Sequence, residues 1–237
     1  MITEISTNPQ LQAGEYLHSL VSDYKDSPVL LFLAGGSALE VLAHIQSDVL
    51  TKNLTICMGD DRFSRDEISN NFLQLQKTDF YSRAVTRFVH FIPTCPNPDE
   101  SHDSFCNRID TALVDYYKTH SSVYTLGLFG VGEDGHIASI FPNTKTEFVK
   151  IYERENYFVT TVQKTVFCPE RISLTPAMIT NSLDTVVLYA VGQAKCTGIL
   201  QRLCDTSIEL HDMPAQVLAV HTNAVLFTDC PYTSKQT

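Results

Sequence analysis

The sequence predicts an α/β fold: a mostly parallel β-sheet flanked by helices on both faces, arranged as a Rossmann-like three-layer sandwich. Apolar runs of strand length recur along the chain and alternate with segments of helical periodicity. Several of these runs are apolar at every position, as expected of strands that are covered on both faces. No repeat or long linker interrupts the 237 residues, so we expect a single α/β domain over residues 1–237.

Six apolar runs are expected to form the strands of this sheet. They span residues 28–34, 54–59, 89–94, 123–130, 185–192 and 222–229. In open α/β sheets, ligands bind beyond the carboxyl ends of the strands. We therefore expect a functional site in the loops that follow these runs.

Two helices are expected between the strands. Leu17, Leu20 and Val21 keep the spacing of one helix face, and the same spacing predicts a longer helix over roughly residues 100–118. The polar stretch 94–103 is expected to be a surface loop inside the domain. We expect the tail, residues 231–237, to be frayed.

The formal net charge of −10 argues against nucleic acid or an anionic membrane as the main partner. It is compatible with a small anionic ligand, because a few well-placed basic side chains and backbone N–H groups hold a phosphate locally. No apolar stretch reaches the ~20 residues needed to span a membrane. The N-terminus shows no basic segment followed by an apolar one, so no secretory signal is expected.

The seven cysteines are scattered along the chain, and none forms a C-x-x-C pair. The pattern therefore indicates neither a zinc site nor a disulfide framework. We expect reduced thiols and a cytoplasmic location.

The first of the loops is Gly35-Gly36-Ser37, which ends an apolar run and precedes a helical segment. Two glycines allow a ligand to approach the backbone closely, and the following helix start offers free N–H groups. Ser37 would cap that helix and donate to an anion. Because the segment matches neither common nucleotide-binding fingerprint, a plain turn with a capping serine is the alternative interpretation.

A second loop carries Asp60, Asp61 and Arg62, followed by Ser69-Asn70 at the start of another helical pattern. An acidic loop with a solvated salt bridge and a helix cap is one interpretation. The functional interpretation is that an acid orients the arginine, or binds sugar hydroxyls, at the mouth of a site. The pattern leaves open which aspartate faces that site.

The third loop reads VGEDGHIASIFP, residues 131–142, with His136 in a glycine-rich turn and a short apolar helix or turn after it. A histidine held at a strand end suits a general base, because its ordinary pKa lies near working pH. Asp134, two residues earlier, would fix its tautomer. Local packing or capping by the histidine is the alternative.

Two further loops each supply one basic residue. Arg171 precedes a short alternating segment and a helix that opens at Thr175-Pro176. Lys195 lies near the start of a helix, where the helix dipole does not complement a cation. Either residue would suit a phosphate ligand, and either would also occur as an ordinary surface charge.

Taken in order, these segments resemble the 6-phosphogluconolactonase family, within the wider group that includes glucosamine-6-phosphate deaminase. The resemblance covers nearly the whole chain, and Gly-Glu-Asp-Gly-His-Ile-Ala-Ser-Ile-Phe-Pro, residues 132–142, is its most specific part. The weaker segments are Gly-Gly-Ser, Asp-Asp-Arg, Arg-Ile-Ser-Leu-Thr, Gly-x-x-Lys and Met-Pro-Ala (213–215). Where the family usually has Thr-Pro after the Gly-Gly-Ser turn, this chain has Ala38-Leu39, and Asp61 replaces the more usual glutamate.

One position separates the two activities of the wider group. The deaminases continue their Asp-Gly-His with Phe-Asn-Glu-Pro, and that glutamate takes part in ring opening and proton transfer. Here Phe141 occupies the glutamate's position. Because an apolar ring exchanges no proton, the resemblance implies lactone hydrolysis rather than deamination.

The resemblance implies hydrolysis of 6-phospho-D-glucono-1,5-lactone to 6-phospho-D-gluconate in the oxidative pentose phosphate pathway, with no cofactor and no metal. Its catalytic residues would be His136, Asp134 and Arg62. Its substrate- and phosphate-binding residues would be Gly35, Gly36, Ser37, Asp60, Arg171 and Lys195. A sugar-phosphate isomerase or deaminase, and a non-catalytic sugar-phosphate-binding protein, are the alternatives. The expected partner is the phosphorylated sugar lactone, and the chain would act as a monomer or homodimer.

Overall fold

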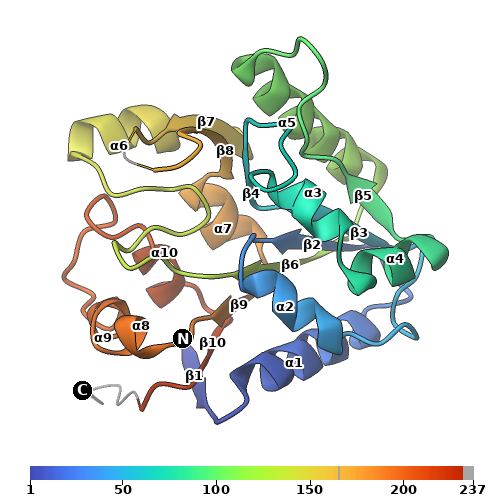
Figure 1. The fold of residues 1–237 in the computed structure, drawn as a ribbon, viewed down its shortest axis with the longest axis horizontal. Coiled ribbons are helices and arrows are strands. Elements are labelled where there is room, and N and C mark those ends of the chain that lie inside the picture. Colours follow the sequence, from blue (N-terminus) through green and yellow to red (C-terminus); the bar gives the residue numbers. More distant parts are fainter. Residues whose placement is uncertain (165, 232–237) are drawn as a thin grey trace.

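The structure is a computed structural model that describes residues 1–164 and 166–231, and it contains two β-sheets (Figure 1). Seven parallel strands form the larger sheet in the order β1-β10-β9-β6-β2-β3-β5. Three antiparallel strands form the smaller sheet in the order β4-β8-β7. The predicted α/β fold with a mostly parallel sheet is confirmed.

The secondary structure follows the predicted alternation. The strands are β1 (Ile2–Ile5), β2 (Val29–Leu33), β3 (Leu54–Met58), β4 (Asp60–Arg62), β5 (His90–Ile92), β6 (Tyr124–Phe129), β7 (Phe158–Val162), β8 (Glu170–Leu174), β9 (Thr185–Tyr189) and β10 (Ala224–Thr228). The α-helices are α1 (Pro9–Asp23), α2 (Ala38–Val41), α3 (Asn71–Gln76), α4 (Asp79–Thr86), α5 (His102–Thr119), α6 (Lys145–Tyr152), α7 (Pro176–Ser182), α8 (Gln193–Cys196), α9 (Ile199–Leu203) and α10 (Gln216–Ala219), and a 3₁₀ turn spans Leu42–His44.

The layers place the smaller sheet on one side of the larger one. In Figure 1, β4, β7 and β8 lie with α5 and α6 above the larger sheet, whereas α1 and α2 lie below it. Helix α5 packs against β7 and β8, and α1 packs against β9 and β10. Both faces of the central strands are thus covered, which explains why β2, β3, β9 and β10 are buried along their whole length.

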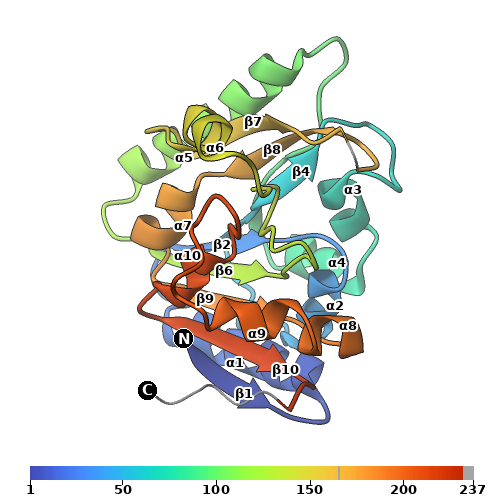
Figure 2. The ribbon, with the colours of Figure 1, turned by 90° about the vertical axis from the view of Figure 1, so that its left-hand side faces the viewer.

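All six strands expected from the apolar runs are present, and both expected helices are found as α1 and α5. The sequence did not predict β1, whose Ile2 and Ile5 are 64% and 48% exposed. This strand is held by pairing with β10 rather than by an apolar pattern of its own, and Figure 2 shows the two side by side. The smaller sheet was also not predicted, because its short strands depend on pairing between distant segments.

The expectation that all cysteines are reduced is wrong for one pair. Cys196 at the end of α8 and Cys230 after β10 form a disulfide. Their 34-residue separation leaves no local spacing signal, and only the tertiary structure brings them together. Of the expected frayed tail, residues 232–237 lie outside the described residues.

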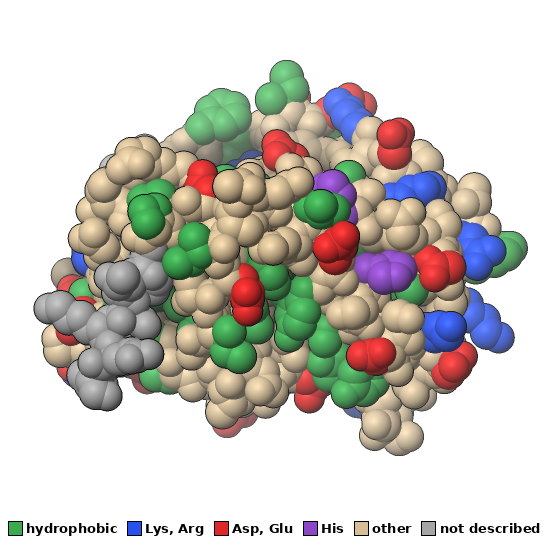
Figure 3. Space-filling model, turned by 90° about the horizontal axis from the view of Figure 1, so that it is seen from below, with side chains coloured by type: hydrophobic (Ala, Val, Ile, Leu, Met, Phe, Trp, Pro, Cys, Tyr) green, Lys and Arg blue, Asp and Glu red, His purple; other side chains and the backbone are tan. Residues whose placement is uncertain are grey.

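One face of the molecule shows how its charged side chains are distributed (Figure 3). On the face shown in Figure 3, acidic side chains occur across the whole view, whereas Lys and Arg lie mainly toward one side. No helix among the described residues has the length and apolar character needed to cross a bilayer.

Gly127 in the middle of β6 is a packing constraint that substitution will test. A Cβ atom there would lie 2.3 Å from the Phe129 ring and 2.9 Å from Leu183. We expect Gly127→Ala to lower the free energy of unfolding by about 1–3 kcal/mol, because the overpacked strand must shift. Urea unfolding followed by circular dichroism measures the change.

Gly130, just beyond the same strand, is the matched control. A Cβ atom there would meet only the Tyr189 carbonyl oxygen, at 3.8 Å. Gly130→Ala should therefore unfold at nearly the wild-type urea concentration. Equal midpoints for both variants would show that the contact with Phe129 does not constrain β6.

Candidate active site

A pocket of about 260 Å³ opens where the loops after β2, β6 and β9 meet β4 and β8. Because the strands of the larger sheet are parallel, their carboxyl ends reach the same edge, and their loops converge there. The pocket is lined by Ala34, Gly35, Gly36, Ser37, Asp60, Arg62, Asn71, Gly130, Val131, Gly132, His136, Ala138, Arg171 and Lys195. All the site residues expected from the sequence line this pocket except Asp134, which contacts His136 from outside it.

The loop after β2 presents its backbone to the pocket. Gly36 has a φ of +64°, a conformation that favours glycine, and a Cβ atom added there would meet nothing within 4 Å. Ser37 is exposed but makes no side-chain capping bond to α2, so the predicted helix-capping role is wrong. Its hydroxyl therefore remains available to a ligand.

The two adjacent aspartates have separate environments. Asp60 lines the pocket, and its Oδ2 accepts a hydrogen bond of 2.6 Å from the Ser139 hydroxyl. Asp61 is fully buried and does not line the pocket; it accepts from the Thr94 hydroxyl and from backbone N–H groups that include those of Asn71 and Phe72. Burial raises the pKa of Asp61 to about 7, although these donors oppose the shift. Asp60 is thus the aspartate that faces the site, and Asp61 fixes the start of α3.

Arg62 and Arg171 are brought side by side because β4 pairs with β8 in a register that sets them opposite each other. The Arg62 Nη1 donates to the Ser69 carbonyl oxygen at 2.6 Å, while its buried Nε has no hydrogen-bond partner among the described residues. A buried N–H donor without a partner lowers the stability of the fold. A ligand oxygen that accepts a hydrogen bond from the Arg62 Nε would remove this cost.

The Arg171 guanidinium is held in a fixed orientation. Its Nε and Nη2 donate to the carbonyl oxygens of Cys168 and Phe167 at 3.0 and 2.9 Å, and its Cζ lies 5.5 Å from the centre of the Phe141 ring. Burial, with a smaller contribution from Arg62, lowers the pKa of Arg171 from its usual value. Two close cations in a partly buried site are stabilised by an anion.

His136 is fixed by Asp134, as expected from the sequence. The Asp134 Oδ1 lies 2.6 Å from the His136 Nδ1 and also accepts from the His136 backbone N–H at 3.1 Å. The turn that permits this arrangement includes Gly135, with a φ of +92°. Partial burial is the largest single influence on Asp134 and acts to raise its pKa, but the hydrogen bonds and the charge of His136, with a backbone hydrogen bond, together outweigh burial and lower the pKa.

The segment after His136 is a turn rather than a helix, with a short bridge between Ile137 and Ile140. The Tyr152 hydroxyl donates to the Ser139 carbonyl oxygen at 3.1 Å and accepts from the Phe141 N–H at 3.0 Å. This contact from α6 holds the Phe141 ring, whose centre lies 4.9 Å from that of the His136 ring. Phe141 therefore lies between the histidine and Arg171.

Lys195 reaches the pocket from α8. Its Nζ donates to the Val131 carbonyl oxygen at 2.7 Å, which ties α8 to the loop that carries His136. Burial lowers the pKa of Lys195, partly offset by Glu133. With Arg62 and Arg171, this side chain makes the pocket locally basic within a chain of net charge −10.

Sequence reasoning did not identify Asn71 and Ser139 as parts of the site. Asn71 is buried and donates from Nδ2 to the Asp60 carbonyl oxygen, and its Oδ1, which has no partner among the described residues, packs against Gly35. Ser139 connects Asp60 to Arg171, whose Nη1 lies 3.5 Å from its hydroxyl. Ser139 lies within the most specific segment, but its partner Asp60 is 79 residues away in the chain, so spacing gives no signal of the contact.

A larger hollow of about 470 Å³ lies between α5, α6 and β7, lined in part by Asn107, Lys150 and Arg154. None of the site residues expected from the sequence lines it. Chemistry-bearing side chains from separate loops converge in the smaller pocket, which is therefore the candidate active site.

The chain is similar to known proteins of one family. The family model described as "Glucosamine-6-phosphate isomerases/6-phosphogluconolactonase" matches residues 11–227. A 6-phosphogluconolactonase of Borreliella burgdorferi is 30% identical over 171 residues, which are 69% of this chain and 66% of that protein. A 6-phosphogluconolactonase of Homo sapiens is 31% identical over 202 residues, which are 81% of this chain and 74% of that protein.

Solved structures show the same fold. A 6-phosphogluconolactonase from Plasmodium vivax superposes with a TM-score of 0.77 at 15% identity, covering 98% of this chain and 90% of that one. One from Shewanella baltica gives a TM-score of 0.75 at 19% identity, covering 96% of both chains. At these identities the likeness shows a shared fold and carries no information about the side chains of the pocket.

The role of Tyr152 in holding the turn after His136 can be tested by stability. In Tyr152→Phe the buried Phe141 N–H and Ser139 carbonyl oxygen lose their shared partner. We expect the free energy of unfolding to fall by about 1–3 kcal/mol, measured by urea denaturation. Tyr24, which is exposed and stacks through its ring on Tyr124, provides the control Tyr24→Phe, with little expected change. A wild-type midpoint for Tyr152→Phe would contradict this role.

Proposed function

Because this chain belongs to the glucosamine-6-phosphate isomerase/6-phosphogluconolactonase family, we propose that it hydrolyses 6-phospho-D-glucono-1,5-lactone to 6-phospho-D-gluconate, a step of the oxidative pentose phosphate pathway. The observation that carries the proposal is His136, oriented by Asp134 and flanked by the apolar ring of Phe141, at the edge of a basic pocket. Both curated relatives described above are named 6-phosphogluconolactonase.

The contact with Asp134 decides which histidine nitrogen acts. Because the lowered pKa keeps Asp134 ionised, the proton shared at 2.6 Å belongs to the His136 Nδ1. The neutral imidazole then carries its lone pair on Nε2, which takes a proton from the attacking water. Asp134 also stabilises the imidazolium formed by that transfer, as an orienting carboxylate does in other histidine-based sites.

Arg62 is the proposed partner of the lactone carbonyl. The attack of water converts the carbonyl oxygen to an oxyanion, and a preorganised cationic donor stabilises that charge as it forms. The unpartnered Nε of Arg62 is a buried donor of this kind. A lactone is an activated ester, so a base and an oxyanion partner meet the needs of the reaction.

The phosphate is proposed to bind to Gly36, Ser37, Arg171 and Lys195. The glycine backbone and the free serine hydroxyl supply neutral donors, and the two cations supply charge. Asp60 helps to hold Arg171 in place: its carboxylate accepts a hydrogen bond from the Ser139 hydroxyl, which in turn contacts the Arg171 guanidinium. Binding the phosphate at a distance from the ester positions the carbonyl next to His136.

Collapse of the tetrahedral intermediate completes the reaction. The bond between the former carbonyl carbon and the ring oxygen breaks, and the His136 imidazolium returns its proton to that oxygen as the new hydroxyl. The carboxylic acid formed then ionises to give 6-phosphogluconate. One water is consumed, and His136 ends neutral, ready for another turnover.

Deamination of a 6-phosphohexosamine is the alternative on this fold. That reaction needs a second proton-transferring group beside the histidine, and here the neighbouring ring is Phe141 at 4.9 Å. We therefore favour the lactone as substrate. A cytoplasmic location and action as a monomer or homodimer remain parts of the proposal.

Substitution of the proposed base tests the mechanism. His136→Ala should reduce turnover of the lactone by roughly 10²–10⁴-fold, because the attacking water loses its proton acceptor. The lactone is generated in situ, and its decay without protein is subtracted because it also hydrolyses spontaneously. His90→Ala is the control, since His90 is exposed on the edge strand β5. Near-normal turnover by His136→Ala would remove this residue from the role.

Substitution of the proposed phosphate clamp should affect substrate binding. Arg171→Ala is expected to raise KM by roughly 10–100-fold with a smaller change in kcat, because a charge-assisted contact to the distant phosphate is lost. Steady-state kinetics across lactone concentrations separate the two constants. Arg154→Ala, an exposed arginine of the larger hollow, is the control. An unchanged KM would contradict the clamp assignment.

A further inference from the structure

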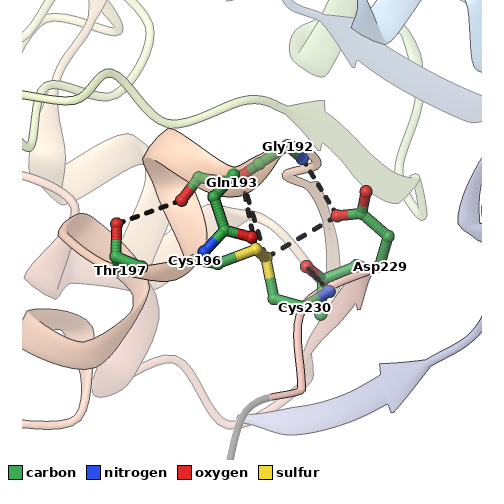
Figure 4. The surroundings of a disulfide bond; sticks show 7 residues. Gly192, Gln193, Cys196, Thr197, Asp229 and Cys230 are labelled. Carbon is green, nitrogen blue, oxygen red and sulfur yellow. Dashed lines mark hydrogen bonds between the residues drawn. A yellow bond between two sulfur atoms is a disulfide. The ribbon is translucent and has the colours of Figure 1, made fainter.

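The disulfide between Cys196 and Cys230 joins a short helix of the active site to the larger sheet (Figure 4). Cys196 is the last residue of α8, and Cys230 lies two residues beyond β10. Lys195, which lines the pocket, directly precedes the bonded cysteine. The covalent bond is therefore adjacent in the chain to a proposed phosphate ligand.

Helix α8 has little else to hold it in place. It is four residues long, none of them buried, and its N-cap is Gly192 without a side-chain cap. A helix this short is unstable by itself. Its contacts with the rest of the fold include the partly buried Cys196, which packs against the core, and the neighbouring helix α9. Its remaining attachments include the Gly192 N–H, which donates to the exposed Asp229 carboxylate at 2.9 Å, and the Lys195 Nζ itself.

The other end of the disulfide is anchored firmly. Strand β10 is buried along its length and pairs with β1 on one side and β9 on the other. Cys230 is 1% exposed, and its N–H donates to the Thr228 hydroxyl at 3.1 Å. The bond thus joins a helix without fully buried residues to a buried strand that is paired on both sides.

We propose that the Cys196–Cys230 disulfide positions Lys195 in the active site, so that the thiol–disulfide state of this pair sets the affinity for the phosphorylated substrate. The inference rests on the proposed function for its substrate. It assigns Cys196 and Cys230 as positioning residues that act through Lys195. Reduction would free α8 to move, and the Lys195 ammonium would then spend less time at the phosphate position.

The chemistry that breaks the bond is thiol–disulfide exchange with a dithiol. Cys196 is partly exposed and Cys230 is buried, so the thiolate of the dithiol attacks the Cys196 sulfur and releases Cys230 as a thiolate, which takes up a proton. The second thiol of the reductant then displaces Cys196 from the mixed disulfide. The protein pair gains two electrons and two protons, and the dithiol becomes a disulfide.

The surroundings of the sulfurs accommodate the reduced pair. The Cys196 Sγ lies 3.3 Å from the Gly192 carbonyl oxygen, and the Cys230 Sγ lies 3.6 Å from the Asp229 Oδ1. Each oxygen would accept a hydrogen bond from the corresponding thiol. Disulfides in reducing compartments are commonly transient or redox-sensing, so a bond of this kind is compatible with the proposed cytoplasmic location.

The test compares kinetics of the full chain in its two redox states. Wild-type protein is assayed for lactone hydrolysis after oxidation and after reduction with dithiothreitol, with a chelator present because Cys196, Asp229 and Cys230 lie close enough to bind a metal ion. We expect reduction to raise KM by roughly tenfold and to change kcat less than twofold, since Lys195 contacts the phosphate rather than the ester.

Variants separate the disulfide from other effects of the reductant. Cys196→Ser should show the raised KM without reductant and should not respond to it. Cys204→Ser, which changes an exposed cysteine outside the disulfide, should respond as the wild type does. In a Lys195→Met background, Cys196→Ser should cause little further rise in KM, because coupled residues are not additive.

The outcomes distinguish this inference from the proposed function. Equal KM values for oxidised and reduced wild type, or full additivity in the Lys195→Met background, would overturn the positioning role. If neither redox state accelerates lactone decay, the lactonase proposal fails. The disulfide inference is then decided by calorimetric titration with inorganic phosphate: roughly tenfold weaker binding after reduction would support it, and equal affinities would overturn it.

Discussion

The buried hydrogen bond between the Ser139 hydroxyl and the Asp60 carboxylate, 2.6 Å long, joins the two sheets at the pocket. Asp60 opens β4 of the smaller sheet, while Ser139 belongs to the loop after β6 of the larger one. Arg171 approaches the same hydroxyl from β8. Because a charged acceptor in a buried position needs its donor, the two sheets cannot shift relative to each other here without losing this contact. Ser139 lies in the segment that follows His136, so the contact also links that segment to Arg171.

The pocket gathers three cationic side chains within an acidic protein, and we propose that this arrangement binds the anionic substrate. Arg62 and Arg171 are set side by side by the pairing of β4 with β8, and Lys195 completes the group from α8. The guanidinium of Arg171 is oriented by two backbone carbonyl groups and the ring of Phe141, so little ordering is required when a ligand arrives. On the proposed function, this local preorganisation favours anion binding in spite of the net charge of −10.

The proposed base His136 and the proposed phosphate ligand Lys195 are held in place by different kinds of contact. His136 stands in a turn fixed by Asp134 and by the contacts of buried Tyr152, which favours a constant geometry for proton transfer. Lys195 stands on a helix without buried residues and is fastened by a disulfide. If both proposals hold, this difference allows the affinity for the phosphate to change while the reacting groups keep their positions.

The sequence by itself determined the six main strands, the two long helices and most of the candidate pocket. It did so because buried parallel strands read as continuous apolar runs, and because the loops at their carboxyl ends carry Gly36, Arg62, His136 and Lys195 within short, ordered segments. Only the tertiary structure decided which of the two aspartates faces the pocket, that Ser139 bridges the sheets, and that Cys196 bonds to Cys230. Each of these depends on contacts between side chains far apart in the chain or on the direction in which a side chain points. Neither long-range contacts nor side-chain directions can be predicted from composition and the spacing of residues.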